Sequence, residues 1–152
     1  MLPVTEKISL YEQDILLWVE DTIAKLQNRD FENLDVEHLI EEVESLGISQ
    51  RKELISRLIV ILEHLLKRLY VNSPHDYHGW ERTIRTQRND LEVLMEQVPS
   101  LKTLWDQSFD KAWKIALKTV REEYHRVNFP TQWPHSRQVE AILNEKFWEH
   151  IV

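Results

Sequence analysis

The sequence predicts an all-α protein: a single bundle of five or six mostly antiparallel helices around a central apolar helix at residues 49–70. Apolar residues recur three and four positions apart, the period of an amphipathic helix, and no stretch alternates as a half-buried strand does. The 152 residues include only two glycines but six tryptophans, which favours packed helices over strands and tight turns. We expect one domain over residues 1–152, with an irregular lead over residues 1–8.

The N-terminal part of the chain carries two helix-start signals. Ser9-Leu-Tyr-Glu12 spells a capping box, in which the serine and glutamate side chains satisfy free amides of the first turn. Asp35 is the expected N-cap of the second helix, and Gly47 is its expected left-handed C-terminal residue. A helical hairpin that folds about Gly47 follows from these signals. The first helix of the chain, which starts at Ser9 and precedes this hairpin, should bury the stripe Tyr11, Ile15, Trp18, Val19, Ile23 and Leu26.

The remaining helices are separated by prolines and polar residues. We expect Ser49 to cap the central helix and a polar loop over residues 72–79 to follow it. A fourth helix should run from Trp80 to just before Pro99, because proline disfavours helix in the residue that precedes it. A long fifth helix should start at Ser100, and a last helix over residues 136–151 should close the bundle.

Composition and charge exclude several classes of protein. No cysteine is present, so disulfides and thiolate chemistry are ruled out. No stretch approaches the roughly 18 apolar residues of a membrane span, and the first residues lack a secretory apolar run, so we expect a cytoplasmic protein that does not enter membranes. Residues 1–63 hold six Lys/Arg against fourteen Asp/Glu, a net charge of −8, whereas residues 64–152 hold thirteen against twelve, a net charge of +1. The acidic N-terminal part argues against nucleic acid as a partner.

A few polar residues are candidates for a metal site. His75 and His78 share the loop at residues 72–79, and with one outside carboxylate they would give a three-ligand site with an open position. Glu122 and His125 form the Glu-x-x-His spacing of di-iron bundles, but no second copy of that spacing exists. Exposed loop histidines explain the first pattern better than a metal site does, and a chance match explains the second better. We therefore expect no cofactor. The common sequence motifs of enzyme active sites are also absent.

The polar pair late in the central helix borders its apolar arc. A hairpin folded about residues 72–79 places Glu63 and His64 opposite Arg88 and Gln87. We predict a Glu63–Arg88 ion pair and a hydrogen bond between His64 and Gln87. Such contacts fix the register of two helices, because breaking a buried pair typically costs about 3–5 kcal/mol.

Several motifs in this order resemble one family. They are Asp14-x-x-x-Trp18, Leu34-Asp35-x-x-x-Leu39-Ile-Glu-Glu-Val-Glu-x-Leu-Gly47, His64-Leu-Leu-Lys67, Trp80-x-x-x-Ile84-x-x-Gln-Arg88 and Pro99-Ser-Leu101. From about residue 10 to 148 the chain resembles the uncharacterised all-helical family catalogued as domain of unknown function 29, common in cyanobacteria. The resemblance implies a small cytoplasmic helical protein, and it implies no activity and no catalytic residues.

For function, the sequence favours a protein-interaction or regulatory module that binds an unknown protein partner or a second copy of itself. The acidic N-terminal part and the six tryptophans support this hypothesis, with Trp133 and Trp148 as the expected exposed residues. The alternative is a metal-binding bundle or a metal-dependent hydrolase that uses His75, His78 or the Glu122/His125 pair. The absence of known active-site motifs argues against an enzyme but does not decide whether the protein is one.

Overall fold

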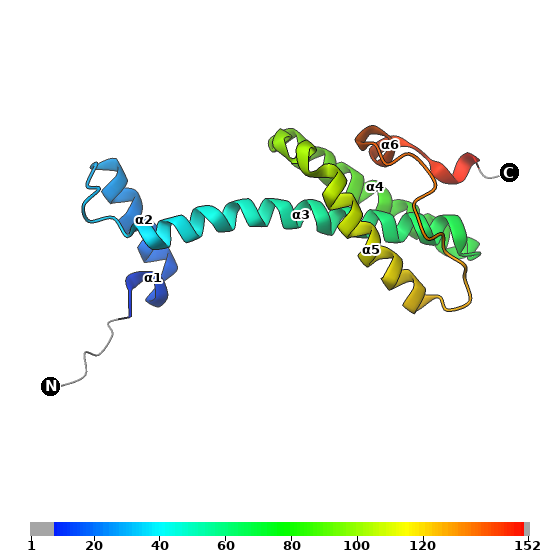
Figure 1. Cartoon of the computed structure of the whole chain (residues 1–152), viewed down its shortest axis with the longest axis horizontal. Coiled ribbons are helices and arrows are strands. Elements are labelled where there is room, and N and C mark those ends of the chain that lie inside the picture. Colours follow the sequence, from blue (N-terminus) through cyan, green and yellow to red (C-terminus); the bar gives the residue numbers. More distant parts are fainter. Residues whose placement is uncertain (1–7, 151–152) are drawn as a thin grey trace. The chain divides into compact units, whose positions relative to one another are not determined.

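The computed structural model describes residues 8–150, and the chain forms two compact units, Met1–Ile48 and Ser49–Val152. The described residues contain α-helices and 3-10 helices and no strand, so the predicted all-α class is confirmed (Figure 1). That the two units belong to one domain stays a prediction of the sequence. The irregular lead predicted for residues 1–8 lies, apart from Ile8, outside the described residues.

The N-terminal unit contains α1 (Leu10–Gln13), α2 (Ile15–Gln27) and the start of α3 (Val36–Tyr70). The predicted Ser9 cap is confirmed, because the Ser9 hydroxyl accepts the amide N–H of Glu12 at 3.3 Å. The first helix is nevertheless divided in two. Asp14 has an extended backbone, and its carboxylate accepts the amide of Leu17 at 3.2 Å to begin α2.

Helix α3 runs without a break from Val36 to Tyr70, so the predicted hairpin at Gly47 is wrong. Gly47 does not have a positive φ, and Ser49 lies inside the helix instead of capping a new one. A glycine in a helix interior costs only about 1 kcal/mol relative to alanine, and strong helix formers on both sides outweigh this cost. The predicted Asp35 cap is confirmed by the hydrogen bond from the amide of His38 to Asp35 Oδ1 at 3.3 Å.

The C-terminal unit is built on the second part of α3. Helix α4 (Pro74–Gln97) starts with proline in its first turn, where a missing N–H costs nothing, so the loop predicted for residues 72–79 is mostly helix. The 3-10 helix η1 (Pro99–Leu104) leads into α5 (Trp105–Glu123). The expected last helix is two short pieces, α6 (Val139–Asn144) and η2 (Phe147–His150), which an extended Glu145 separates.

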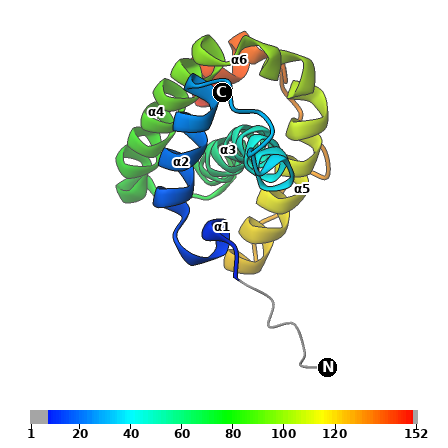
Figure 2. The same ribbon diagram turned by 90° about the vertical axis from the view of Figure 1, so that its left-hand side faces the viewer.

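The core of the C-terminal unit surrounds the second part of α3, which Figure 2 shows end on with α4 and α5 on either side. Leu54, Leu58, Ile61, Leu62 and Leu65 are fully buried, which confirms the expected central position of residues 49–70. Residues from α4, α5 and α6 complete the same cluster, among them Leu91, Phe109 and Ile142. This core positions the polar groups that the next sections describe.

Candidate functional site

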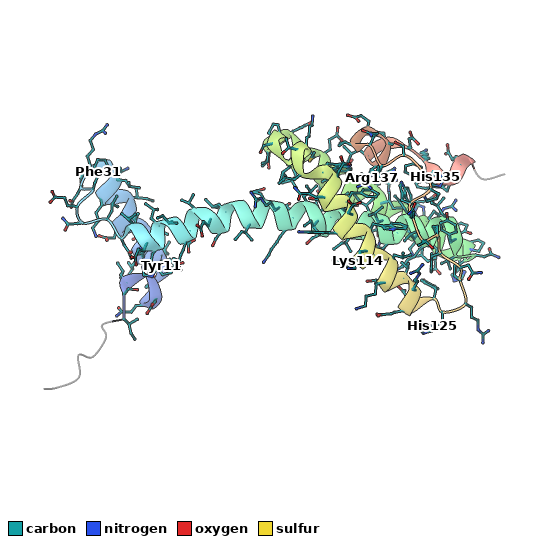
Figure 3. All side chains as sticks on the ribbon, viewed as in Figure 1. Tyr11, Phe31, Lys114, His125, His135 and Arg137 are labelled. Atoms are coloured by element: carbon teal, nitrogen blue, oxygen red, sulfur yellow. The ribbon has the colours of Figure 1, made fainter. Side chains whose placement is uncertain are left out.

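The candidate metal ligands do not converge. His75 and His78 lie in the first turns of α4, and the His75 side chain is 84 % exposed beside Asp76. Glu122 and His125 are exposed at the end of α5 (Figure 3 labels His125). Over the described part of the chain, no group of three or more His, Asp, Glu or Cys side chains is placed to hold a metal ion. The geometry therefore gives the metal-binding alternative no support.

The predicted Glu63–Arg88 ion pair is wrong, because the two side chains belong to different faces of the bundle. Arg88 turns toward the C-terminal segment, where its Nε donates to Ile142 O at 2.7 Å and its Nη2 to Glu145 O at 2.6 Å. Glu63 instead has Lys67 and Thr119 as its electrostatic neighbours. Burial raises the pKa of the Glu63 carboxyl, and the positive charge of Lys67 partly offsets that effect.

The predicted His64–Gln87 contact is also wrong. His64 Nδ1 pairs with the carbonyl of Val60, one turn back on the same helix, at 2.8 Å, and burial lowers the pKa of this imidazole. Gln87 accepts a hydrogen bond from Arg57 at 3.1 Å, and Arg57 also pairs with Asp90 at 3.1 Å. Because α4 starts at Pro74 and not at Trp80, the two helices meet in a register that the predicted loop did not allow.

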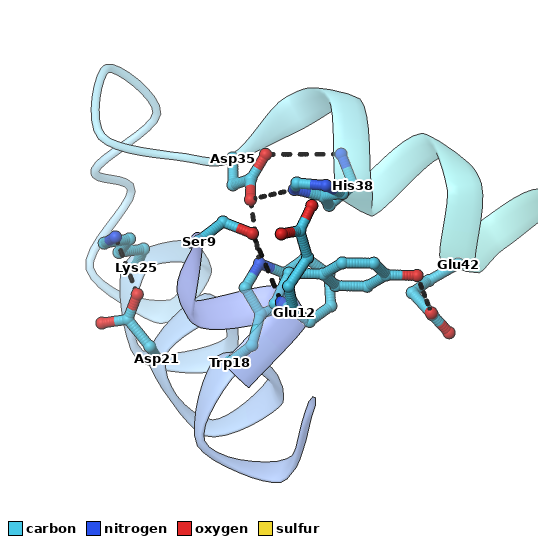
Figure 4. A network of polar contacts seen from close by, with 9 residues as sticks. Ser9, Glu12, Trp18, Asp21, Lys25, Asp35, His38 and Glu42 are labelled. Carbon is cyan, nitrogen blue, oxygen red and sulfur yellow. Dashed lines mark hydrogen bonds and ion pairs between the residues drawn. The ribbon is translucent and has the colours of Figure 1, made fainter. Parts of the chain in front are cut away.

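The N-terminal unit is held together by a polar and aromatic network (Figure 4). Asp35 Oδ2 accepts the indole N–H of Trp18 at 3.2 Å and lies 2.6 Å from His38 Nδ1. The Tyr11 ring stacks on His38 at 4.1 Å between centroids, and its hydroxyl donates to Glu42 at 2.5 Å. These contacts join α1 and α2 to the start of α3.

The same network shifts the pKa values of three of its members. The hydrogen bond with His38 lowers the pKa of Asp35, and the bond to Asp35 raises the pKa of His38. The hydrogen bond to the Glu42 carboxylate raises the pKa of Tyr11 to about 12. At neutral pH the tyrosine is thus a fixed hydrogen-bond donor.

The N-terminal unit buries little and exposes much of its apolar surface. Within residues 8–48 only Trp18 and Thr22 are buried. Of the sixteen large apolar side chains that are exposed in the described chain, fourteen lie in these residues, including Phe31 in the loop between α2 and α3 (Figure 3). A unit this small cannot bury enough apolar surface by itself, and here it leaves most of that surface outside.

Two apolar stripes make up most of this surface. Successive helical residues are turned by about 100°, so residues three and four apart share a face. The α3 stripe is Val36, Ile40, Val43 and Leu46, each between 51 % and 67 % exposed. The α2 stripe is Ile15, Leu16, Val19, Ile23 and Leu26, which the sequence analysis placed mostly in a buried stripe and which the structure leaves exposed. The amphipathic pattern revealed these residues, but nothing in it showed which stripe would be covered.

Trp133 and Trp148, the tryptophans expected at the surface, are both partly buried against the main core. The Trp133 ring meets Phe147 edge to face at 5.2 Å between centroids, and its indole N–H donates to Ser136 O. Trp105 and Trp113 likewise donate to carbonyls of the segment after α5, at Arg137 and Thr131. The indole hydrogen bonds of Trp105 and Trp113 therefore attach the segment after α5 to helix α5.

These features define a class: an all-helical protein with a well-packed C-terminal unit and an apolar, acidic N-terminal unit. In the described residues no helix combines the length and the apolar character needed to cross a membrane. The chain belongs to the family described as Domain of unknown function DUF29, whose model matches residues 10–148. No curated protein and no solved structure matches the chain.

Proposed function

We propose that the protein is a protein-interaction module and that its docking surface is formed by the α2 and α3 stripes of the N-terminal unit. The main support for this proposal is that most of the exposed large apolar side chains of the described chain lie in residues 8–48. A large exposed apolar surface usually marks an interface. A partner that covers it would add the apolar burial that this unit lacks, and its binding would stabilise the fold.

The shape of the α3 stripe favours an α-helix as the occupant. Val36, Ile40, Val43 and Leu46 follow the three- and four-residue spacing of a helix-packing seam. Gly47 lies on the same face, and a Cβ atom built there would have no heavy atom within 4 Å. Nothing in the described chain requires a glycine at this position, whereas a closely packed partner helix would.

The charge of the unit favours a basic partner over a second copy. Residues 8–48 contain two Lys/Arg against eleven Asp/Glu, a net charge of −9. Glu37, Glu41 and Glu44 flank the α3 stripe on its exposed side. Two copies joined through this surface would bring like charges together, which is costly at an interface. We therefore assign the surface to a helix of another protein that carries an apolar seam with lysine or arginine beside it.

Matched aspartate variants test the surface. Val43→Asp places a charge in the α3 stripe, and Val93→Asp places the same charge at an exposed valine of α4 in the other unit. Partner captured from the native host by the wild-type chain should be lost with Val43→Asp and kept with Val93→Asp. Its binding should weaken as salt rises, because screening removes the attraction between opposite charges. Equal capture by the two variants would contradict the proposal.

Sedimentation and thiol labelling decide between the other occupants. If sedimentation shows that the wild-type chain is a dimer and that Val43→Asp is a monomer, the occupant of the surface is a second copy and not a basic partner. The chain has no cysteine, so Leu46→Cys introduces a unique reporter on the α3 stripe and Val120→Cys a buried reference in α5. The Leu46→Cys thiol should react far faster than the Val120→Cys thiol in the isolated monomer. Similar slow rates would show that the chain covers this surface itself, and the proposal would fail.

A further inference from the structure

A cavity of about 360 Å³ lies in the C-terminal unit between α4 and the segment that runs from the end of α6 into η2. From α4 it is lined by Ile84, Arg85, Arg88 and Asn89, and from the later segment by Leu143 and Trp148, among other residues. Its volume falls within the range of pockets that hold small molecules. None of the residues of the docking surface takes part in it.

The lining of this cavity carries more positive than negative charge. Its two carboxylates already have cationic partners, since Glu81 lies 3.4 Å from Arg68 and Glu149 lies 3.5 Å from Lys146. Arg85 and Arg88 have no carboxylate within 4 Å among residues 8–150. Neither guanidinium group therefore has an ion-pair partner in the described chain, although burial lowers the pKa of Arg88 and the nearby negative charge of Glu145 partly offsets that effect.

Arg88 is the more unusual of the two guanidinium groups. Only 8 % of the residue is exposed, and burial lowers its pKa to about 10. Its Nε and Nη2 donate to two backbone carbonyls, and Nη1 makes no hydrogen bond within the described chain. Burying a charge without a carboxylate in direct contact is expensive, so a chain that keeps one usually gains something from it. The carbonyls fix the orientation of the guanidinium and leave one edge free for a ligand.

We propose that this cavity binds a small organic anion, with its phosphate or carboxylate group on Arg85 and Arg88 and its apolar part against Ile84, Leu143 and Trp148. Guanidinium groups bind such oxyanions through paired N–H donors. Asn89 adds an amide that can donate to the same group. The cavity thus combines an apolar wall with converging donors, the arrangement of small-molecule sites.

Calorimetric titration with phenyl phosphate and with benzoate, at constant ionic strength, tests this site. The two probes share an aromatic ring and differ in the anionic group, so their relative affinity shows which oxyanion the site prefers. Arg85→Gln removes one cation that lines the cavity at an exposed position of α4. Arg82→Gln is the matched control, because Arg82 is also exposed on α4 but does not line the cavity.

We expect the better probe to bind the wild-type chain and the Arg82→Gln variant within twofold of one another. Arg85→Gln should weaken binding at least tenfold. Arg88→Lys, which keeps the charge but loses the paired donors, should weaken it as well, provided that its circular dichroism matches that of the wild type. Failure of both probes to bind, or an equal loss in Arg82→Gln and Arg85→Gln, would overturn the proposal. Neither result depends on the docking surface of the N-terminal unit.

Discussion

His38 Nδ1 lies 2.6 Å from Asp35 Oδ2, and the same oxygen accepts the indole N–H of Trp18 at 3.2 Å. One carboxylate thus caps α3, orients the imidazole and anchors the buried tryptophan of α2. In a unit with so few buried apolar residues, this carboxylate is a main link between its helices. Its charge state therefore controls how tightly the unit is assembled.

The Asp35–His38 pair should make the N-terminal unit sensitive to pH. The pKa of His38 is raised from 6.5, so its contribution to stability is present below that value and is lost as pH rises through the folded pKa. The pKa of Asp35 is lowered from 3.8, so its contribution is present above 3.8 and is lost as pH falls through the folded pKa. The pair should thus help most between about pH 4 and about pH 6.5.

An NMR titration checks this expectation. The His38 pKa should be higher in the folded chain than in the chain unfolded by urea. Asp35→Asn keeps a side chain that can cap α3 and removes the charge, so it should return the His38 pKa toward its unfolded value. A His38 pKa that Asp35→Asn leaves unchanged would show that the carboxylate does not hold the imidazole.

Tyr11 should ionise at a higher pH than an ordinary tyrosine. Its hydrogen bond to Glu42 raises the Tyr11 pKa to about 12, so the stability it contributes is present below its unfolded pKa of 10.0 and is lost as pH rises through the folded value. When tyrosinate absorbance is followed as pH is raised, one tyrosine should ionise at higher pH than the others, and this step should be missing in Tyr11→Phe. Glu42→Gln, which removes the negative charge, should move that step to lower pH, and an unmoved step would exclude Glu42 as its cause.

Replacing Gly47 by alanine should raise the stability of the chain and weaken the binding of its partner. Gly47→Ala removes an unfavourable residue from the interior of α3 and meets no atom within 4 Å, so the free energy of unfolding should rise by about 0.5–1 kcal/mol. The added methyl group lies on the face of the α3 stripe, so partner binding should weaken. Gly79→Ala in α4 also meets no atom within 4 Å and should raise stability without changing binding. Chemical denaturation and partner capture measure the two effects, and unchanged binding by Gly47→Ala would argue against close approach of a helix at this point.

Leu62 lies at the centre of the C-terminal unit and is fully buried. Leu62→Ala should lower the free energy of unfolding by about 2–5 kcal/mol, because a cavity adds to the lost burial. Val93→Ala removes apolar atoms from an exposed position of α4 and should change the free energy of unfolding by less than about 0.5 kcal/mol. Denaturant unfolding followed by tryptophan fluorescence gives both values. Equal losses for the two variants would show that the core is centred elsewhere.

Much of the fold could be predicted because local signals act within one helical turn. The hydroxyl of Ser9 and the carboxylate of Asp35 each satisfy free amides at a helix start, and Pro99 cannot continue the ladder of α4. The central position of residues 49–70 was likewise readable from the width of their apolar arc. For the candidate sites, sequence reasoning named Arg88 but gave it the wrong partner, and it did not anticipate the cavity beside it.

The sequence by itself determined the helical class, the helix caps at Ser9 and Asp35, and the family. Only the structure showed that α3 continues through Gly47, where the local cost of glycine is small beside the cooperativity of a long helix. It also decided that Arg88 turns to the carbonyls of Ile142 and Glu145, which are more than fifty residues away along the chain. The apolar stripes of α2 and α3 are written in the sequence, but their exposure depends on which surfaces meet in three dimensions, and no local pattern encodes that.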